Sequence, residues 1–175
     1  LTVNPRKSRE FAVAVRIPAW SKITMVTVNG QAVADVRPGS YLTVSRTWKE
    51  GDKIALNFDM RGRLTELNGY QAIERGPVVL ARDTRLGEGF VDETCVVQTS
   101  GGYVELMPVT DKPAGVWMAF SAPMKLGTDT EGRAAGIVQV PLCDFASAGN
   151  TWHPAVRYRV WLRRTFDPIS DPWVE

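Results

Sequence analysis

Phe11-Ala12-Val13-Ala14-Val15-Arg16-Ile17 alternates large apolar residues with small or charged ones, and the run from Ile54 to Met60 repeats this alternation. A period of two places every second side chain on the same face of an extended strand. Both segments are therefore predicted to be strands with one apolar and one polar face. Strands of this kind bury one face against a second layer, so the core is expected to lie between two sheets.

Turn signals separate the apolar runs at Asn29-Gly30, Pro38-Gly39-Ser40 and Glu50-Gly51-Asp52. Asn-Gly favours a tight hairpin because both residues tolerate a positive φ. The chain contains 15 glycines and 11 prolines, and their scatter leaves few windows long enough for a helix. The predicted fold is therefore all-β, an antiparallel β-sandwich of jelly-roll-like type built from many short strands.

The second half of the chain shows the same style with less regularity. A strand is predicted from Tyr70 to Ala81, and its interruption at Gly76-Pro77 is interpreted as an edge or a bulge, because proline cannot donate to a central ladder. The alternation of apolar and charged residues from Val156 to Arg163 predicts one continuous final strand.

A charged segment without periodicity, from Arg82 to Glu93, is the best candidate for a domain boundary. It divides the chain into a first β-sandwich subdomain over 1–84 and a second over 85–175. Halves of this size are near the lower end of typical domains, so they are expected to pack on each other. One continuous sandwich over 1–175 is the alternative.

Composition argues against several classes of partner. The formal net charge is only +2, which does not favour nucleic acid, and no stretch approaches the roughly 18 apolar residues of a membrane span. The first residues, Leu1 to Pro5, resemble the end of a strand, so we expect a segment of a longer protein. Cys95 and Cys143 have no ligand spacing around them, and they are predicted to be reduced core thiols, with a disulfide as the alternative.

No residue pattern makes a convincing catalytic site. His153 is the single histidine, and together with Cys143 or Asp144 it could form a nucleophile and base pair. No nucleophile motif surrounds Cys143, however. An acid and base pair of the glycosidase kind could come from the carboxylates Glu66, Glu74, Asp83, Asp92 and Glu93. Sequence gives no distance between these groups. No catalytic residue, cofactor or metal ligand is therefore predicted.

The aromatic residues are the more informative candidates. Trp117 and Trp161 fall on the face opposite the apolar residues of their predicted strands, and Trp161 has Arg157, Arg159 and Arg163 nearby. An exposed Trp beside Arg can stack on a sugar ring and bond its hydroxyls. Alternatively, another domain or a partner covers these faces, and this interpretation is the favoured one. The arginines are then a salt-bridged interface rather than a nucleic-acid site.

Several segments of the chain occur together in a known family. In sequence order they are Arg16-Ile17-Pro18-Ala19-Trp20, Val28-Asn29-Gly30, Gly39-Ser40-Tyr41-Leu42, Arg46-Thr47-Trp48-Lys49-Glu50-Gly51-Asp52 and Glu74-Arg75-Gly76-Pro77-Val78-Val79. Their order and spacing resemble the region downstream of the barrel in glycoside hydrolase family 127, which contains the β-L-arabinofuranosidases. The stretch from Val140 to Leu162 resembles the family's closing segment more loosely.

This resemblance implies a role without catalysis. In that family a cysteine nucleophile, a glutamate and a cysteine-bound zinc lie in an N-terminal (α/α)6 barrel, and the β-sandwiches follow it. None of the catalytic motif occurs here, so Cys95 and Cys143 inherit no role from it, and no zinc is expected.

The hypothesis is therefore a non-catalytic accessory β-sandwich region, C-terminal to the barrel, that braces the barrel or a homodimer interface. The alternative is a carbohydrate-binding module for arabinose-containing or other plant glycans. What such enzymes degrade implies a periplasmic or extracellular bacterial location.

Overall fold

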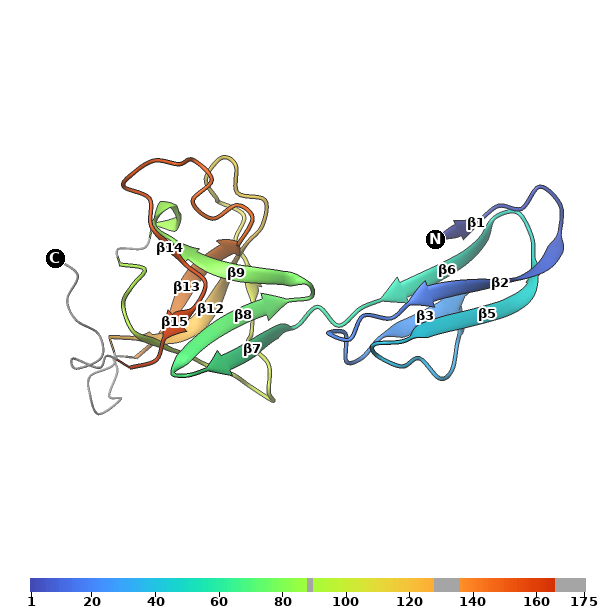
Figure 1. Ribbon diagram of the computed structural model, residues 1–175, viewed down its shortest axis with the longest axis horizontal. Coiled ribbons are helices and arrows are strands. Elements are labelled where there is room, and N and C mark those ends of the chain that lie inside the picture. Colours follow the sequence, from blue (N-terminus) through green and yellow to red (C-terminus); the bar gives the residue numbers. More distant parts are fainter. Residues whose placement is uncertain (88–89, 128–135, 166–175) are drawn as a thin grey trace. The chain divides into compact units, whose positions relative to one another are not determined.

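The computed structural model describes residues 1–87, 90–127 and 136–165. Its described strands are all paired antiparallel, and a single 3-10 turn, Thr84–Leu86, is the only helical element among the described residues (Figure 1). The predicted all-β antiparallel class is confirmed. None of the described residues forms a helix long and apolar enough to cross a membrane.

The chain forms two compact units, unit 1 from Leu1 to Met60 and unit 2 from Arg61 to Glu175. This division differs from the predicted boundary between residues 84 and 85. Strands that precede residue 84 pair with strands at the far end of the chain, as described below, so they belong to unit 2. The segment from Arg82 to Glu93 belongs to unit 2, in which Arg82 and Asp83 are buried.

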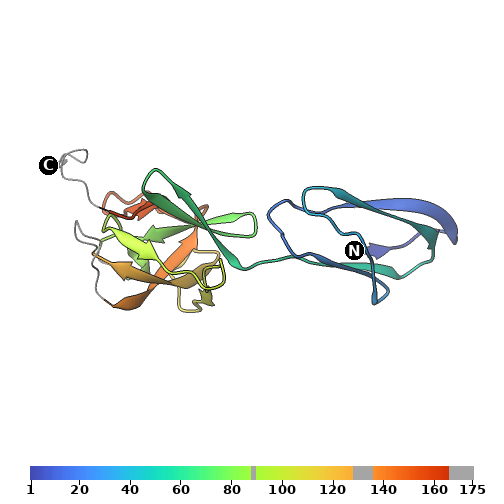
Figure 2. The ribbon, with the colours of Figure 1, turned by 90° about the horizontal axis from the view of Figure 1, so that it is seen from below.

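Unit 1 is a small sandwich of two sheets. Its strands are β1 (Thr2–Val3), β2 (Arg9–Arg16), β3 (Met25–Val28), β4 (Gln31–Ala32), β5 (Tyr41–Trp48) and β6 (Asp52–Asn57). One sheet has the order β1-β6-β3-β4 and the other pairs β2 with β5 (Figure 2). Inward residues of both sheets form one apolar core around Trp48, whose indole N–H donates to the Phe11 carbonyl at 2.9 Å.

The predicted Asn-Gly hairpin is confirmed in unit 1. Asn29 and Gly30 have φ values of 50° and 83°, and they connect β3 to β4. The Asn29 side chain also donates to the carboxylate of Asp52 at 2.9 Å, and the Lys49 amide donates to the same carboxylate at 2.9 Å. The bond from Lys49, followed by that from Asn29, lowers the pKa of Asp52.

Unit 2 is built around one large antiparallel sheet. Its strands are β7 (Gly62–Leu67), β8 (Tyr70–Arg75), β9 (Val78–Asp83), β10 (Cys95–Val97), β11 (Met107–Pro108), β12 (Ala119–Leu126), β13 (Ile137–Asp144), β14 (Tyr158–Arg159) and β15 (Leu162–Arg163). The main order is β10-β12-β13-β9-β8-β15, with β11 on β12, β14 on β9 and β7 on β8. The two ends of this order, β10 and β15, lie close together, so the sheet is nearly closed like a barrel.

A buried glutamine helps to close the sheet of unit 2. Gln71, on β8, is fully buried, and its side-chain oxygen accepts from the Val97 amide of β10 at 2.9 Å. The enclosed core is apolar, and its fully or almost fully buried members include Ile73, Met124 and Leu142. Cys95 and Cys143 are both buried thiols that form no disulfide, as the sequence predicts. Burial raises the pKa of Cys143 to about 12.

Two predictions about unit 2 are wrong in detail. Gly76-Pro77 is neither an edge nor a bulge, because Arg75 pairs with Val78 and the dipeptide is the two-residue turn of the β8–β9 hairpin. A proline outside the ladder loses no hydrogen bond there. The predicted final strand is also not continuous, since β14 pairs with β9 while β15 pairs with β8. The chain therefore changes partner strand between Arg159 and Leu162.

Candidate functional site

The change of partner strand near the end of unit 2 determines the position of Trp161. Leu162 follows it, pairs with Gln71 and is buried in the core, whereas Trp161 itself is 43% exposed. Trp161 lies at the bend immediately before β15, and the burial of its neighbour Leu162 fixes the backbone at this point. Trp161 is thus held at the surface beside a residue that is fixed in the core.

Trp161 lines an open hollow together with Leu67, Asn68 and Tyr70, with a volume of about 380 Å³. Leu67 and Tyr70 are the paired ends of the β7–β8 hairpin, and Asn68-Gly69 is its turn, with φ values of 48° and 80°. The amide of Arg164 donates to the Gly69 carbonyl at 2.9 Å. The chain that follows β15 is therefore tied to the tip of the hairpin that forms the other wall.

One charged group contacts a lining residue of this hollow. Arg163 donates through Nε to the Tyr70 hydroxyl at 3.2 Å, and its guanidinium lies 5.7 Å from the centre of the Tyr70 ring. Arg164 forms an ion pair with Glu66 at 3.1 Å, and both side chains are nearly half exposed. The Tyr70 hydroxyl and the Arg163 guanidinium thus add hydrogen-bonding groups beside the apolar lining.

The other predicted arginines have separate partners. Arg159 forms an ion pair with Asp92, and Arg157 donates to the carbonyls of Pro154 and Val156. Arg163, as described above, contacts Tyr70. The three arginines that the sequence places near Trp161 do not share one continuous strand, because the chain changes partner strand between Arg159 and Leu162.

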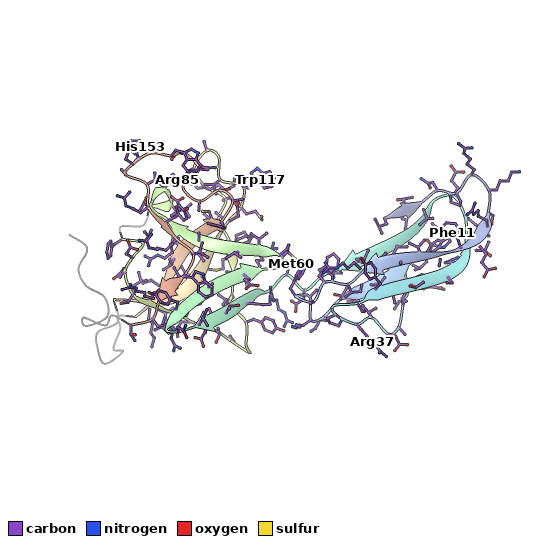
Figure 3. All side chains as sticks on the ribbon, viewed as in Figure 1. Phe11, Arg37, Met60, Arg85, Trp117 and His153 are labelled. Carbon is purple, nitrogen blue, oxygen red and sulfur yellow. The ribbon has the colours of Figure 1, made fainter. Side chains whose placement is uncertain are left out.

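Trp117 lies in a different part of unit 2. It precedes β12 and is 81% exposed, and its backbone amide donates to the Ser147 hydroxyl at 3.0 Å. Figure 3 shows Trp117, Arg85 and His153 at the same end of unit 2. The loop after β13 adjoins this segment, since the Asn150 side chain donates to the Gly115 carbonyl at 2.9 Å. The structure therefore does not bring Trp117 and Trp161 into one hydrogen-bonded site.

A third tryptophan, Trp152, was not among the residues that the sequence singled out. It is 91% exposed and has a φ of 55°, which is unusual for a residue with a large side chain. Phe145 and Tyr158 are also exposed, and their ring centres are 6.1 Å apart. The name aromatic surface is used below for the four exposed side chains of Trp117, Phe145, Trp152 and Tyr158, which come from the segment before β12, the loop after β13 and β14. The signal for Trp152 was its position in a polar loop beside His153, where no core pattern accounts for a large aromatic residue.

A buried ionic network supports the loops of the aromatic surface. Asp83 is fully buried, and its carboxylate accepts from the Arg85 side chain at 2.7 Å and from the Gly149 amide at 2.9 Å. Arg85 also donates to the Ser147 carbonyl at 2.6 Å and to the Asn150 side chain at 2.7 Å. Burial alone would raise the pKa of Asp83, but the hydrogen bonds from Arg85 and Gly149 together lower it.

Asp144 extends this network to the strand that follows Trp117. It accepts from the Ser147 amide at 3.0 Å and hydroxyl at 2.7 Å, and from the Met118 amide at 3.0 Å. The loop after β13 and the segment before β12 are thus held by buried acceptors at both ends. This arrangement fixes backbone positions and leaves the aromatic side chains free to contact something else.

The structure does not bring the candidate base and nucleophile together. His153 is exposed and accepts from the Ala155 amide at 3.2 Å, whereas Cys143 is fully buried. Burial raises the pKa of the Cys143 thiol to about 12, which favours its protonated form at neutral pH. Four of the five candidate carboxylates are ion-paired, namely Glu66 with Arg164, Glu74 with Arg63, Asp83 with Arg85 and Asp92 with Arg159.

Metal binding finds no support in the described part of the chain. Over residues 1–87, 90–127 and 136–165, no group of three or more His, Cys, Asp or Glu side chains could hold an ion. The segment Asp129 to Gly132, which weakly resembles the start of a calcium loop, lies outside the described residues.

Comparison with known families links unit 1 to glycoside hydrolases. Residues 1–60 match the family model described as beta-L-arabinofuranosidase, GH127 middle domain. The matched range coincides with unit 1. The match supports the resemblance to family 127 and describes this part as a middle domain, whereas the C-terminal placement of the whole chain stays a prediction. No curated protein matches the chain.

Solved structures extend the likeness of fold over both units. A glycoside hydrolase is 26% identical with a TM-score of 0.73, covering 95% of this chain and 30% of that one. A GH127 β-L-arabinofuranosidase from Geobacillus stearothermophilus T6 is 22% identical with a TM-score of 0.67, covering 94% and 28%. A further GH127 β-arabinofuranosidase is 21% identical with a TM-score of 0.64, covering 90% and 28%. The chain spans less than a third of each of these proteins.

Proposed function

We propose that this chain is a non-catalytic accessory region of a family 127-like glycoside hydrolase, and that it braces the enzyme's catalytic barrel. The observation that carries the proposal is the match of residues 1–60, an independently compact unit, to the GH127 middle domain. The pairing of the candidate carboxylates and the burial of Cys143 support a role outside the chemistry. Export from the cell is part of the proposal, because the glycans that such enzymes degrade are found outside it.

The aromatic surface supports the bracing role. Trp117 and Trp152 are almost fully exposed, yet the backbone around them is fixed by the buried Asp83–Arg85 and Asp144 network. Large exposed aromatic groups on a rigid backbone are typical of contact surfaces, because they bury much area with little loss of conformational entropy. We assign this surface to the rest of the parent chain, since the chain spans only 30% of the similar glycoside hydrolase.

The absence of catalysis has a direct test. The purified chain is incubated with an aryl β-L-arabinofuranoside, and release of the aryl alcohol is followed by absorbance. The account predicts no release above that of buffer. Hydrolysis that scales with protein concentration and survives further purification would overturn the proposal, and a full-length family 127 enzyme serves as the positive control.

A further inference from the structure

The hollow at Trp161 has the size and the lining of a small-ligand site. Its volume of about 380 Å³ lies within the roughly 300–1,000 Å³ of such sites. Among the described residues that line it, Tyr70 and Trp161 are aromatic, and Leu67 adds an aliphatic group that is 57% exposed.

The polar groups adjoining the hollow favour a ligand with hydroxyl groups. The Asn68 side chain offers both donors and an acceptor. The Tyr70 oxygen accepts from Arg163 at 3.2 Å, which turns the hydroxyl hydrogen away from the guanidinium. A sugar ring has the matching chemistry, an apolar C–H face for an aromatic ring and a rim of hydroxyls.

The charge next to the hollow is compatible with a neutral ligand. The Arg163 guanidinium donates to the Tyr70 hydroxyl and lies over the Tyr70 ring. An anionic ligand would have to compete with Tyr70 for this guanidinium, whereas neutral hydroxyls can bond beside it.

The walls of the hollow are fixed before any ligand arrives. The Asn68-Gly69 turn joins paired strands, the Arg164 amide bonds to Gly69, and Leu162 anchors the opposite wall in the core. A site whose groups are already ordered loses little further entropy on binding, so even a shallow contact can be specific.

We propose that the hollow formed by Leu67, Asn68, Tyr70 and Trp161 binds one ring of a neutral glycan, with Trp161 and Tyr70 as the stacking surfaces. The choice of a sugar over other neutral ligands rests on the proposed function, since an accessory site in a glycoside hydrolase meets glycans. The site is separate from the aromatic surface, which we assign to contact with the parent chain.

Titration of the isotope-labelled 175-residue chain with a linear arabinan trisaccharide, followed by NMR, tests this site. Saturable shifts are expected for the Trp161 indole and the Asn68 side-chain amide. A cellulose-derived trisaccharide in a parallel titration shows whether the site prefers arabinose, and saturable binding of either trisaccharide at the hollow supports the proposal. Shifts confined to Trp117 and Trp152, or no saturable shift with either sugar, would overturn it.

Variants connect the shifts to the stacking surface. Trp161→Ala is expected to weaken binding at least about tenfold, as truncation of a central aromatic contact does. Trp161→Phe keeps a ring and should retain most of the affinity, and Trp117→Ala is the matched control with unchanged affinity. Equal affinity of Trp161→Ala and wild type would contradict the proposal. Because the hydrolysis assay on the same sample tests the proposed function independently, failure of one can be distinguished from failure of the other.

Discussion

Unit 1 and unit 2 are both built from antiparallel sheet, but their interiors contain different kinds of residue. Unit 1 encloses an apolar core with Trp48 at its centre, and its buried polar residues are Ser21 and Asp52, the latter at the start of β6. Unit 2 encloses an apolar core as well, but it also buries Gln71, Arg82, Asp83 and Asp144. In unit 2, therefore, buried charged groups and exposed aromatic side chains occur together. The buried carboxylates of Asp83 and Asp144 bond to the segments that carry Trp117 and Trp152.

The largest effect is expected from the apolar centre of unit 1. Trp48→Ala removes a fully buried side chain and should cost about 3–5 kcal/mol of the free energy of unfolding. Denaturant unfolding followed by Trp fluorescence would show an early transition for unit 1. A single unshifted transition would mean that this core does not control the stability of unit 1.

The buried ion pair of unit 2 should have the next largest effect. Asp83→Asn keeps the shape of the side chain but removes the charge that Arg85 faces, and should cost about 2–3 kcal/mol of unfolding free energy. The matched control is Glu74→Gln at the more exposed Arg63–Glu74 pair, for which about 0–1 kcal/mol is expected. Equal effects in the two variants would remove the distinction between the buried network and an ordinary surface pair.

The turn of unit 1 provides a smaller and local test. Gly30 has a φ of 83°, and an alanine there would meet no steric neighbour within 4 Å, so any loss comes from the backbone conformation. Gly30→Ala is expected to cost about 1 kcal/mol, as a left-handed residue with a side chain does. Gly136→Ala, at a position without positive φ and with no neighbour within 4 Å among the described residues, is the control and should leave the melting temperature unchanged.

The stability that Asp83 contributes to unit 2 should depend on pH. The pKa of Asp83 is lowered in the folded state, so its contribution to stability is complete above the ordinary value of 3.8 and is lost as the pH falls through the folded-state value. Melting temperatures of wild type and Asp83→Asn measured from pH 6 downward should therefore converge below about pH 4. A constant difference across this range would mean that Asp83 is not charged in the native state.

Much of unit 1 could be predicted because its pattern is regular. The alternation at Phe11 to Ile17 marks β2, and the Asn29-Gly30 signal marks its hairpin. In unit 2 the segment from Arg82 to Glu93 looked like a boundary because it is charged and aperiodic. A sequence does not show that the charge of Asp83 is neutralised by Arg85 and bonded by Gly149, 66 residues away.

The candidate sites show the same limit. The prominence of Trp161 and Trp117 could be seen from their positions opposite apolar residues. The partners of Trp161 could not, because its hollow joins a hairpin tip at Asn68 to a strand about a hundred residues later, and only the pairing of β15 with β8 brings them together. The alternation of apolar and charged residues also could not show the change of partner strand between Arg159 and Leu162. The short strands β14 and β15 together keep the alternation that one longer strand would show.

The most direct test of bracing is thermal inactivation of the full-length parent enzyme carrying Trp117→Ala and Trp152→Ala together. Loss of contact at the aromatic surface should make the catalytic barrel inactivate at a lower temperature, while Trp161→Ala in the same protein should leave the inactivation temperature unchanged. Identical inactivation of the double variant and wild type, with both tryptophans shown to be exposed in the full-length protein, would contradict the central claim that this region braces the barrel.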